Sequence, residues 1–268
     1  MNDYTKIRDY WEKIALSNNS NDYKDHWLKS DGTPVNAQMY AEVARFVSRY
    51  TNNVNDEILE IGCGTGRILS EVMSHGYNNV TGIDFSAAQI DICKQRELNC
   101  NLWVGDLFDF RREFSSKRFD LIFLHSVTQY FPSAEYFEKF LTSALETLQP
   151  RGKILLIDVP ISWYKDEMIA STPKDKIVKV IKDIVPIYFI EKVKSFRSVK
   201  YVKERIGDVY IEYEAFNGFY VEPIVIENIC GAYDKQVEMI YQPFSEKPMI
   251  YKKFRPIFVI SDASTENV

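Results

Sequence analysis

Short apolar runs alternate with helical segments through the middle of the chain. Between residues 57 and 158 the runs Glu57–Ile61, Asn79–Ile83, Asn101–Val104, Phe119–Leu124 and Lys153–Ile157 each have the length and apolar content of a buried strand. Amphipathic segments separate them, and helices are expected at Arg67–His75, from the N-cap Ser86 to about Leu98, and from the N-cap Ser133 to Leu148. Apolar strands that alternate with helices predict a doubly wound α/β fold whose sheet is mostly parallel.

The flanking regions have different patterns. Residues 35–50 carry apolar positions at helical spacing and predict an amphipathic helix, followed by a polar break at 51–56. After residue 160, an amphipathic stretch at 175–194 predicts a helix that Pro186 interrupts, and alternation across 196–220 around Gly207-Asp208 predicts a β-hairpin. A helix at 222–230 and strands at 237–241 and 256–261 complete the expected elements. We therefore expect an N-terminal helical cover (1–50), a core (51–160), an inserted α+β lid (161–220), and a C-terminal helix with a closing hairpin (221–268).

Composition narrows the class of protein. The chain has 268 residues, 46% of them hydrophobic, and a formal net charge of −5, which is typical of a globular domain and lacks the basic footprint of general nucleic-acid binding. No stretch is long and apolar enough for a membrane span, and the first residues contain no apolar core of a signal peptide. Four scattered cysteines and three histidines offer neither a disulfide framework nor a metal cluster. We expect a cytoplasmic protein with reduced thiols, without nucleic-acid partners or stable membrane insertion.

The segment after the first expected strand carries the strongest chemical signal. Glu60 precedes glycines at every second position, Gly62, Gly64 and Gly66, and a helix follows directly. The dinucleotide-binding fingerprint has the spacing G-x-G-x-x-G, whereas this segment is G-x-G-x-G with an acid two residues before it. An acid at that point suits a cationic ligand rather than a pyrophosphate. Asp84 ends the second strand, where a carboxylate can accept hydrogen bonds from two ribose hydroxyls, and Asp106 follows the third strand.

Glu60 to Gly66, Asp84, Asp106 and the segment 119–130 occur in the order and spacing of one family. The chain resembles the class I S-adenosylmethionine-dependent methyltransferases, whose first motif is (I/L)-L-(E/D)-x-G-x-G-x-G. The resemblance covers roughly residues 55–160 and implies a seven-stranded sheet with an antiparallel C-terminal strand and S-adenosyl-L-methionine as cofactor. It implies that Glu60, Gly62 and Gly64 line the methionine part of that cofactor, and that Cys63 and Gly66 also bind it. It further implies Asp84 on the ribose, Phe85 against the adenine, and Asp106 and Leu107 at its amino edge.

The end of the fourth strand is the expected place for catalysis. His125 lies where ligands bind in open α/β sheets, beyond the carboxyl ends of the strands. Three roles stay open for it: packing beside the methionine group, acting as general base, or a structural hydrogen bond. Gln129 and Tyr130 are candidate substrate contacts, and Tyr10 and Trp11 are candidates in a covering segment whose aromatic rings can stabilise a sulfonium.

These observations lead to an expected function with two alternatives. We expect methyl transfer to an oxygen or nitrogen of a small-molecule or glycan-type acceptor, by a monomer or homodimer that needs no metal. Residues 161–206 contain eleven Lys/Arg and six Asp/Glu, a local charge of +5 that suits an anionic acceptor. The alternatives are an NAD(P)-dependent oxidoreductase of the Rossmann type and a non-catalytic partner subunit with the methyltransferase fold.

Overall fold

The structure is a computed structural model of the whole chain. It describes residues 4–17, 37–106, 114–162, 201–206, 209–214, 219–244 and 255–263. The expected helix at 175–194 and most of the basic segment therefore lie outside the described residues. Leu107 lies outside them as well.

The sheet has seven strands in the order β3-β2-β1-β4-β5-β9-β8. Its first five members in chain order pair in parallel, whereas β9 runs antiparallel to both β5 and β8. This confirms the expected mostly parallel sheet with an antiparallel C-terminal strand. The strands are β1 Ile58–Ile61, β2 Val80–Asp84, β3 Asn101–Val104, β4 Phe119–His125, β5 Leu148–Ile157, β8 Lys235–Ile240 and β9 Ile257–Asp262.

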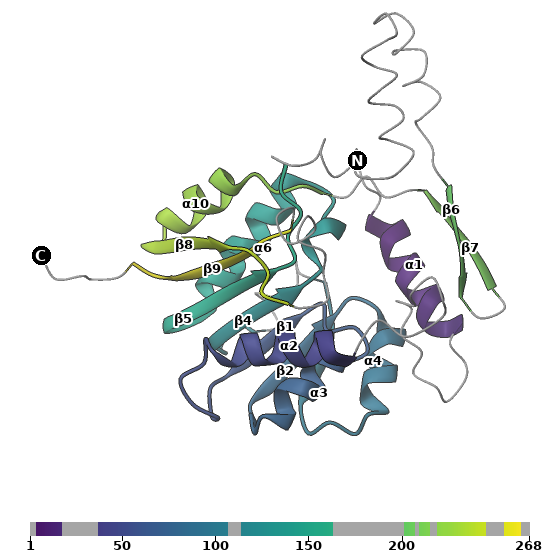
Figure 1. Ribbon diagram of the computed structural model, residues 1–268, viewed down its shortest axis with the longest axis horizontal. Coiled ribbons are helices and arrows are strands. Elements are labelled where there is room, and N and C mark those ends of the chain that lie inside the picture. The colour runs from purple at the N-terminus through teal and green to yellow at the C-terminus, as the bar shows by residue number, and fades with distance from the viewer. Residues whose placement is uncertain are drawn as a thin grey trace, which may run out of the picture.

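Helices cover both faces of the sheet, as Figure 1 shows. On one face, α6 (Ala134–Glu146) and α10 (Pro223–Gly231) pack against strand residues that include Leu59 and Ile122. On the other face, α2 (Ala37–Ser48), α3 (Arg67–Ser74) and α4 (Ala87–Lys94) contribute to a second core with Ile58 and Leu121. Neighbouring strand residues point into different cores because side chains alternate along a strand.

The remaining elements lie outside the sheet. Helix α1 (Tyr4–Ser17) packs on α4, and a short helical turn, η1 (Thr128–Tyr130), follows β4. Strands β6 (Tyr201–Ile206) and β7 (Val209–Glu214) form the expected hairpin. Figure 1 places α1 at one end of the sheet, on the same side of the molecule as that hairpin. The ends of the predicted insertion lie side by side, because Ile161 and Val221 form a β-bridge.

Three predicted boundaries in the core were wrong. Helix α6 ends at Glu146 and β5 begins at Leu148, whereas the sequence favoured a helix to Leu148 and a strand from Lys153. The strand starts early because Leu148 pairs with Phe119, and the register then shifts before Leu121 meets Lys153. Helix α4 ends at Lys94, four residues before the predicted end, and Glu97 has a left-handed φ of 54° that no helix accommodates.

Candidate active site at the carboxyl edge of the sheet

The turn between β1 and α3 depends on its glycines. Gly62, Gly64 and Gly66 have φ values of 72°, 53° and 77°, in the left-handed region that favours glycine. At Gly66 a Cβ atom would lie 2.2 Å from the Sγ atom of Cys93, and at Gly62 it would lie 2.5 Å from a methyl group of Val127. The turn therefore packs directly on α4 and on the segment after β4.

Asp84, at the end of β2, braces this turn. Its Oδ2 atom accepts a hydrogen bond from the Gly64 N–H at 2.8 Å, and its Oδ1 atom accepts one from the Ser86 N–H at 2.9 Å. Burial raises the pKa of Asp84 from 3.8 to about 6, although these backbone donors favour the charged form. A carboxylate offers about four lone-pair sites, so both oxygens retain capacity for a ligand hydroxyl.

Glu60 lies beside Asp84 on the neighbouring strand. The side chain is buried, and its Oε2 atom has no hydrogen-bond partner among the described residues. Burial raises the pKa of Glu60 well above its ordinary value, and the negative charge of Asp84 raises it further. Two buried acids at the ends of adjacent strands would be stabilised in their charged form by a cation and would repel a pyrophosphate.

The other predicted cofactor residues occupy different environments. The Cys63 side chain packs against Gly82 of β2, and burial raises the pKa of its thiol well above the ordinary range. Phe85 is half-buried directly after Asp84. Asp106, after β3, accepts a hydrogen bond from the hydroxyl group of Tyr136 on α6, a contact that the sequence analysis did not anticipate.

The segment after β4 contains the predicted catalytic residue and two predicted substrate contacts. His125 is the last residue of β4, pairs with Ile157 of β5, and is half-buried. Tyr130 packs edge-to-face on Trp11 of α1, with ring centroids 5.5 Å apart, and Trp11 has the same arrangement with Tyr10 at 5.3 Å. The structure thus brings three of the predicted aromatic residues together beside the end of β4.

Helix α1 is held at a second point by Glu12. Its carboxylate accepts hydrogen bonds from the N–H groups of Ala87 and Ala88, at 2.9 and 3.1 Å, in the first turn of α4. A negative charge at a helix N-terminus is stabilising. Because α4 follows β2 and Tyr130 follows β4, α1 spans the point where the strand order of the sheet reverses.

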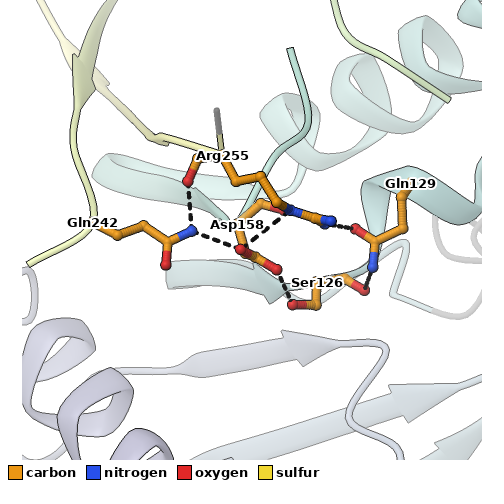
Figure 2. A network of polar contacts seen from close by, with 5 residues as sticks. All are labelled: Ser126, Gln129, Asp158, Gln242 and Arg255. Atoms are coloured by element: carbon orange, nitrogen blue, oxygen red, sulfur yellow. Dashed lines mark hydrogen bonds and ion pairs between the residues drawn. The ribbon is translucent and has the colours of Figure 1, made fainter. Parts of the chain in front are cut away.

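Five polar residues form a network at the ends of β4, β5 and β8 and before β9, shown in Figure 2. Asp158, directly after β5, is 1% exposed and accepts hydrogen bonds from Ser126 Oγ and Gln242 Nε2. It also forms an ion pair with Arg255, whose Nε atom lies 3.3 Å from Asp158 Oδ1. Arg255 Nη2 donates to Gln129 Oε1, and Gln129 Nε2 donates to the Ser126 carbonyl at 2.8 Å. Both ends of the Gln129 amide are therefore bound to protein groups.

Several residues of this edge were not predicted from the sequence. Asp158 carries the same signal that identified Asp84 and Asp106, an acid directly after a strand, and could have been found from it. Glu12, Tyr136 and Arg255 carry no local signal, because each acts on an element distant in the sequence. Among the described residues no group of three or more His, Cys, Asp or Glu side chains is placed to hold a metal ion, and no helix has the length and apolarity to cross a membrane.

Comparisons with known proteins agree with this geometry. Residues 58–152 match the model of a family described as a methyltransferase domain. Chondramide synthase cmdD of Chondromyces crocatus is 34% identical over 145 residues, 52% of this chain and 4% of that protein. EEF1A lysine methyltransferase 2 of Danio rerio is 26% identical over 139 residues, 47% of this chain and 57% of that protein. The chain thus spans less than two thirds of either relative.

A solved structure extends the likeness to the whole fold. The magnesium protoporphyrin IX methyltransferase (ChlM) of Synechocystis PCC 6803, with bound SAM, superposes with a TM-score of 0.60 at 13% identity and covers 98% of both chains. The strand order, the glycine turn with its two buried acids and the matching domain model agree with one another. Residues 58–152 thus match a methyltransferase domain, and the fold of the chain is the fold of that solved methyltransferase.

Proposed function

We propose that the protein binds S-adenosyl-L-methionine and transfers its methyl group to an oxygen or nitrogen of a small-molecule or glycan-type acceptor. The observation that carries the proposal is the pair of buried carboxyl groups, Glu60 and Asp84, on either side of the glycine turn. When bound, the cofactor supplies a methyl group on a positively charged sulfonium. The Oε2 atom of Glu60, which has no hydrogen-bond partner among the described residues, and the left-handed glycine turn fit a cationic ligand that approaches the backbone of the turn closely.

The residues have separate tasks in this proposal. Glu60 and the turn hold the methionine part, Asp84 accepts hydrogen bonds from the ribose hydroxyls, and Asp106, oriented by Tyr136, meets the adenine. His125 faces the reacting groups from the end of β4 and takes the proton that the acceptor loses. Since the leaving group is already activated, alignment and removal of that proton supply most of the catalysis.

The acceptor side is formed by α1 and the η1 segment. A small acceptor is favoured because α1 crosses the site and is held near its middle by two adjacent residues, by Glu12 on α4 and by Trp11 on Tyr130. Such a cover excludes water and limits the size of what can enter. The local charge of +5 over residues 161–206 favours an anionic acceptor that enters from that side.

The cofactor proposal is tested by equilibrium binding. S-Adenosylhomocysteine should bind to the full chain, and Asp84→Ala should weaken that binding at least about tenfold, the loss expected for a charge-assisted hydrogen bond. Preference for NADH over S-adenosylhomocysteine would instead favour the oxidoreductase. Unchanged affinity in Asp84→Ala would remove Asp84 from the ribose site.

The catalytic proposal needs an acceptor panel, assayed for release of S-adenosylhomocysteine. With an acceptor that supports turnover, His125→Ala should lower turnover about 100-fold or more, as loss of a general base does, and leave cofactor affinity nearly unchanged. If turnover is unaltered, His125 has a packing or structural role. A folded, cofactor-binding chain that turns over no acceptor in the panel would favour the non-catalytic partner subunit.

A further inference from the structure

The chain turns in the same unusual way at the ends of two adjacent strands. Ser126, after β4, and Asp158, after β5, have φ values of 57° and 66°, in the left-handed region, although neither is glycine. Each such residue costs about 1–2 kcal/mol of conformational energy. A cost of this kind persists only where surrounding contacts overdetermine the conformation.

The network of Figure 2 supplies those contacts. The hydroxyl group of Ser126 donates to the carboxylate of Asp158, so the two left-handed residues are tied to each other, and the Ser126 N–H donates to the Ile157 carbonyl at 3.0 Å. Arg255 binds Asp158 twice, by its ion pair and by donation from Nη2 to the Asp158 carbonyl at 3.0 Å. The same guanidinium group reaches Gln129, which binds back to the Ser126 carbonyl.

The segment held in this way, residues 126–130, connects His125 with the glycine turn and with the returning end of the insertion. It begins immediately after His125, and the Val127 side chain packs where Gly62 has no side chain, so it also touches the cofactor turn. The Gln129 carbonyl accepts a hydrogen bond from the Phe219 N–H at 3.0 Å, close to the returning end of the insertion. A shift of residues 126–130 would therefore move His125 relative to the glycine turn.

We propose that Asp158 and Arg255 are positioning residues: with Ser126 and Gln129 they hold the segment after β4 in its left-handed turn and so fix the direction of His125. The positioning proposal depends on the function proposed above in one respect only, the reaction in which His125 takes part. It assigns Gln129 to positioning, because its amide is bound to Arg255 and to Ser126.

The test uses the histidine resonances of the full chain by NMR. The protein has three histidines, so the imidazole signals can be assigned with single His→Gln variants. Arg255→Gln should shift or broaden the His125 signals and leave the His75 signals in place, since His75 lies at the end of α3 beside Ser48. The matched control is Lys235→Gln. It removes a different ion pair, the one that Lys235 of β8 forms with Asp262 of β9, and should move neither the His125 nor the His75 signals.

A second variant covers the case in which Arg255→Gln does not fold, since it leaves a buried carboxylate without its cation. Ser126→Gly removes the hydroxyl donor but also removes the left-handed cost, so the fold is retained, and the His125 signals should shift or broaden as well. Ser126→Ala keeps the conformational cost of the left-handed φ and loses the hydroxyl donor. It should therefore give the same change in the His125 signals, with a lower stability of the fold. Unchanged His125 signals in the folded variants would overturn the proposal.

A kinetic arm separates this proposal from the proposed function. With any acceptor that the panel identifies, Ser126→Gly should lower kcat about 10-fold to 100-fold, the range for small misplacements of reacting groups, and change the Kd for S-adenosylhomocysteine less than about threefold. Unchanged kcat would contradict positioning. If the wild-type chain turns over no acceptor, the proposed function fails, and the histidine signals still decide the positioning role.

Discussion

Replacing Asp84 with asparagine should change how the stability of the unliganded protein depends on pH. Burial raises the pKa of this group in the folded chain to about 6, against 3.8 ordinarily. Between these values the folded state holds a proton that the unfolded state releases, so the free energy of unfolding falls as pH rises. The stabilisation is fully present below 3.8 and is lost as pH rises through about 6. The difference, 6 − 3.8, corresponds to about 3 kcal/mol in total.

The assay is urea denaturation of wild type and Asp84→Asn, without ligand, at several values between about pH 4.5 and pH 8. Over that interval Asp84 should contribute a loss of about 2 kcal/mol to the wild type and none to the variant. Asparagine also places an amide against one of the backbone donors, Gly64 or Ser86, a penalty of about 1–3 kcal/mol that does not vary with pH. The changing difference between the two profiles therefore reports the ionisation of Asp84 together with its effect on the neighbouring Glu60. Glu138→Gln, an exposed acid on α6, serves as control and should track the wild type.

Parallel profiles for wild type and Asp84→Asn would refute the reasoning, because they would mean that Asp84 ionises at its ordinary pH in the folded state. The same reasoning predicts that affinity for the cationic cofactor rises with pH through about 6. Ionising this buried carboxyl group costs free energy in the unliganded protein, and a bound cation offsets that cost by stabilising the charged form.

Three further substitutions test contacts of the site. Glu12→Gln removes a charge from the N-terminus of α4, so it should lower stability by about 0.5–1 kcal/mol and speed limited proteolysis within α1. Gly66→Ala should cost about 2–4 kcal/mol in urea denaturation, from the left-handed φ and the overlap with Cys93, and adding Cys93→Ala should recover part of that loss. Tyr136→Phe should weaken S-adenosylhomocysteine binding by up to about tenfold in calorimetry, because Asp106 loses the donor that orients it.

Each of these predictions has a control on the same chain. Lys13→Gln changes an exposed neighbour of Glu12 and should leave the proteolysis rate unchanged. Tyr77→Phe removes a hydroxyl group that bonds to Thr51, away from the site, and should not affect ligand binding. Additive effects of the two substitutions at Gly66 and Cys93 would show that their side chains do not collide.

The sheet and half of the site follow from local pattern. Apolar runs bounded by turn residues located all seven strands of the sheet. The glycine spacing at residues 62–66 predicted the tight turn after β1, because all three glycines lie in one segment. Ser86 and Ser133 were expected as helix caps, and each side chain accepts a hydrogen bond in the first turn. The predicted ends of helices and strands were wrong where strand pairing determines them, as at Leu148, whose partner Phe119 is far away in the sequence.

The remainder of the site depends on contacts between distant segments. Arg255 meets Gln129 across 126 positions, and Glu12 meets Ala87 across 75, so no window of the sequence contains both partners. The left-handed residues Ser126 and Asp158 illustrate the same limit. Serine and aspartate usually adopt negative φ values, and the tertiary network overrides that preference at these two positions.

The bridge between Ile161 and Val221 makes the segment between them exchangeable. The chain leaves the core and returns to it at one point, so the intervening segment is a cassette whose replacement leaves every pairing of the seven-stranded sheet intact. The entropic cost of closing such a loop grows only slowly with its length, by about 0.6 kcal/mol for each doubling. Segments of different length and charge can therefore be transplanted between these two residues, and under the function proposed above acceptor choice can diverge while the glycine turn stays unchanged.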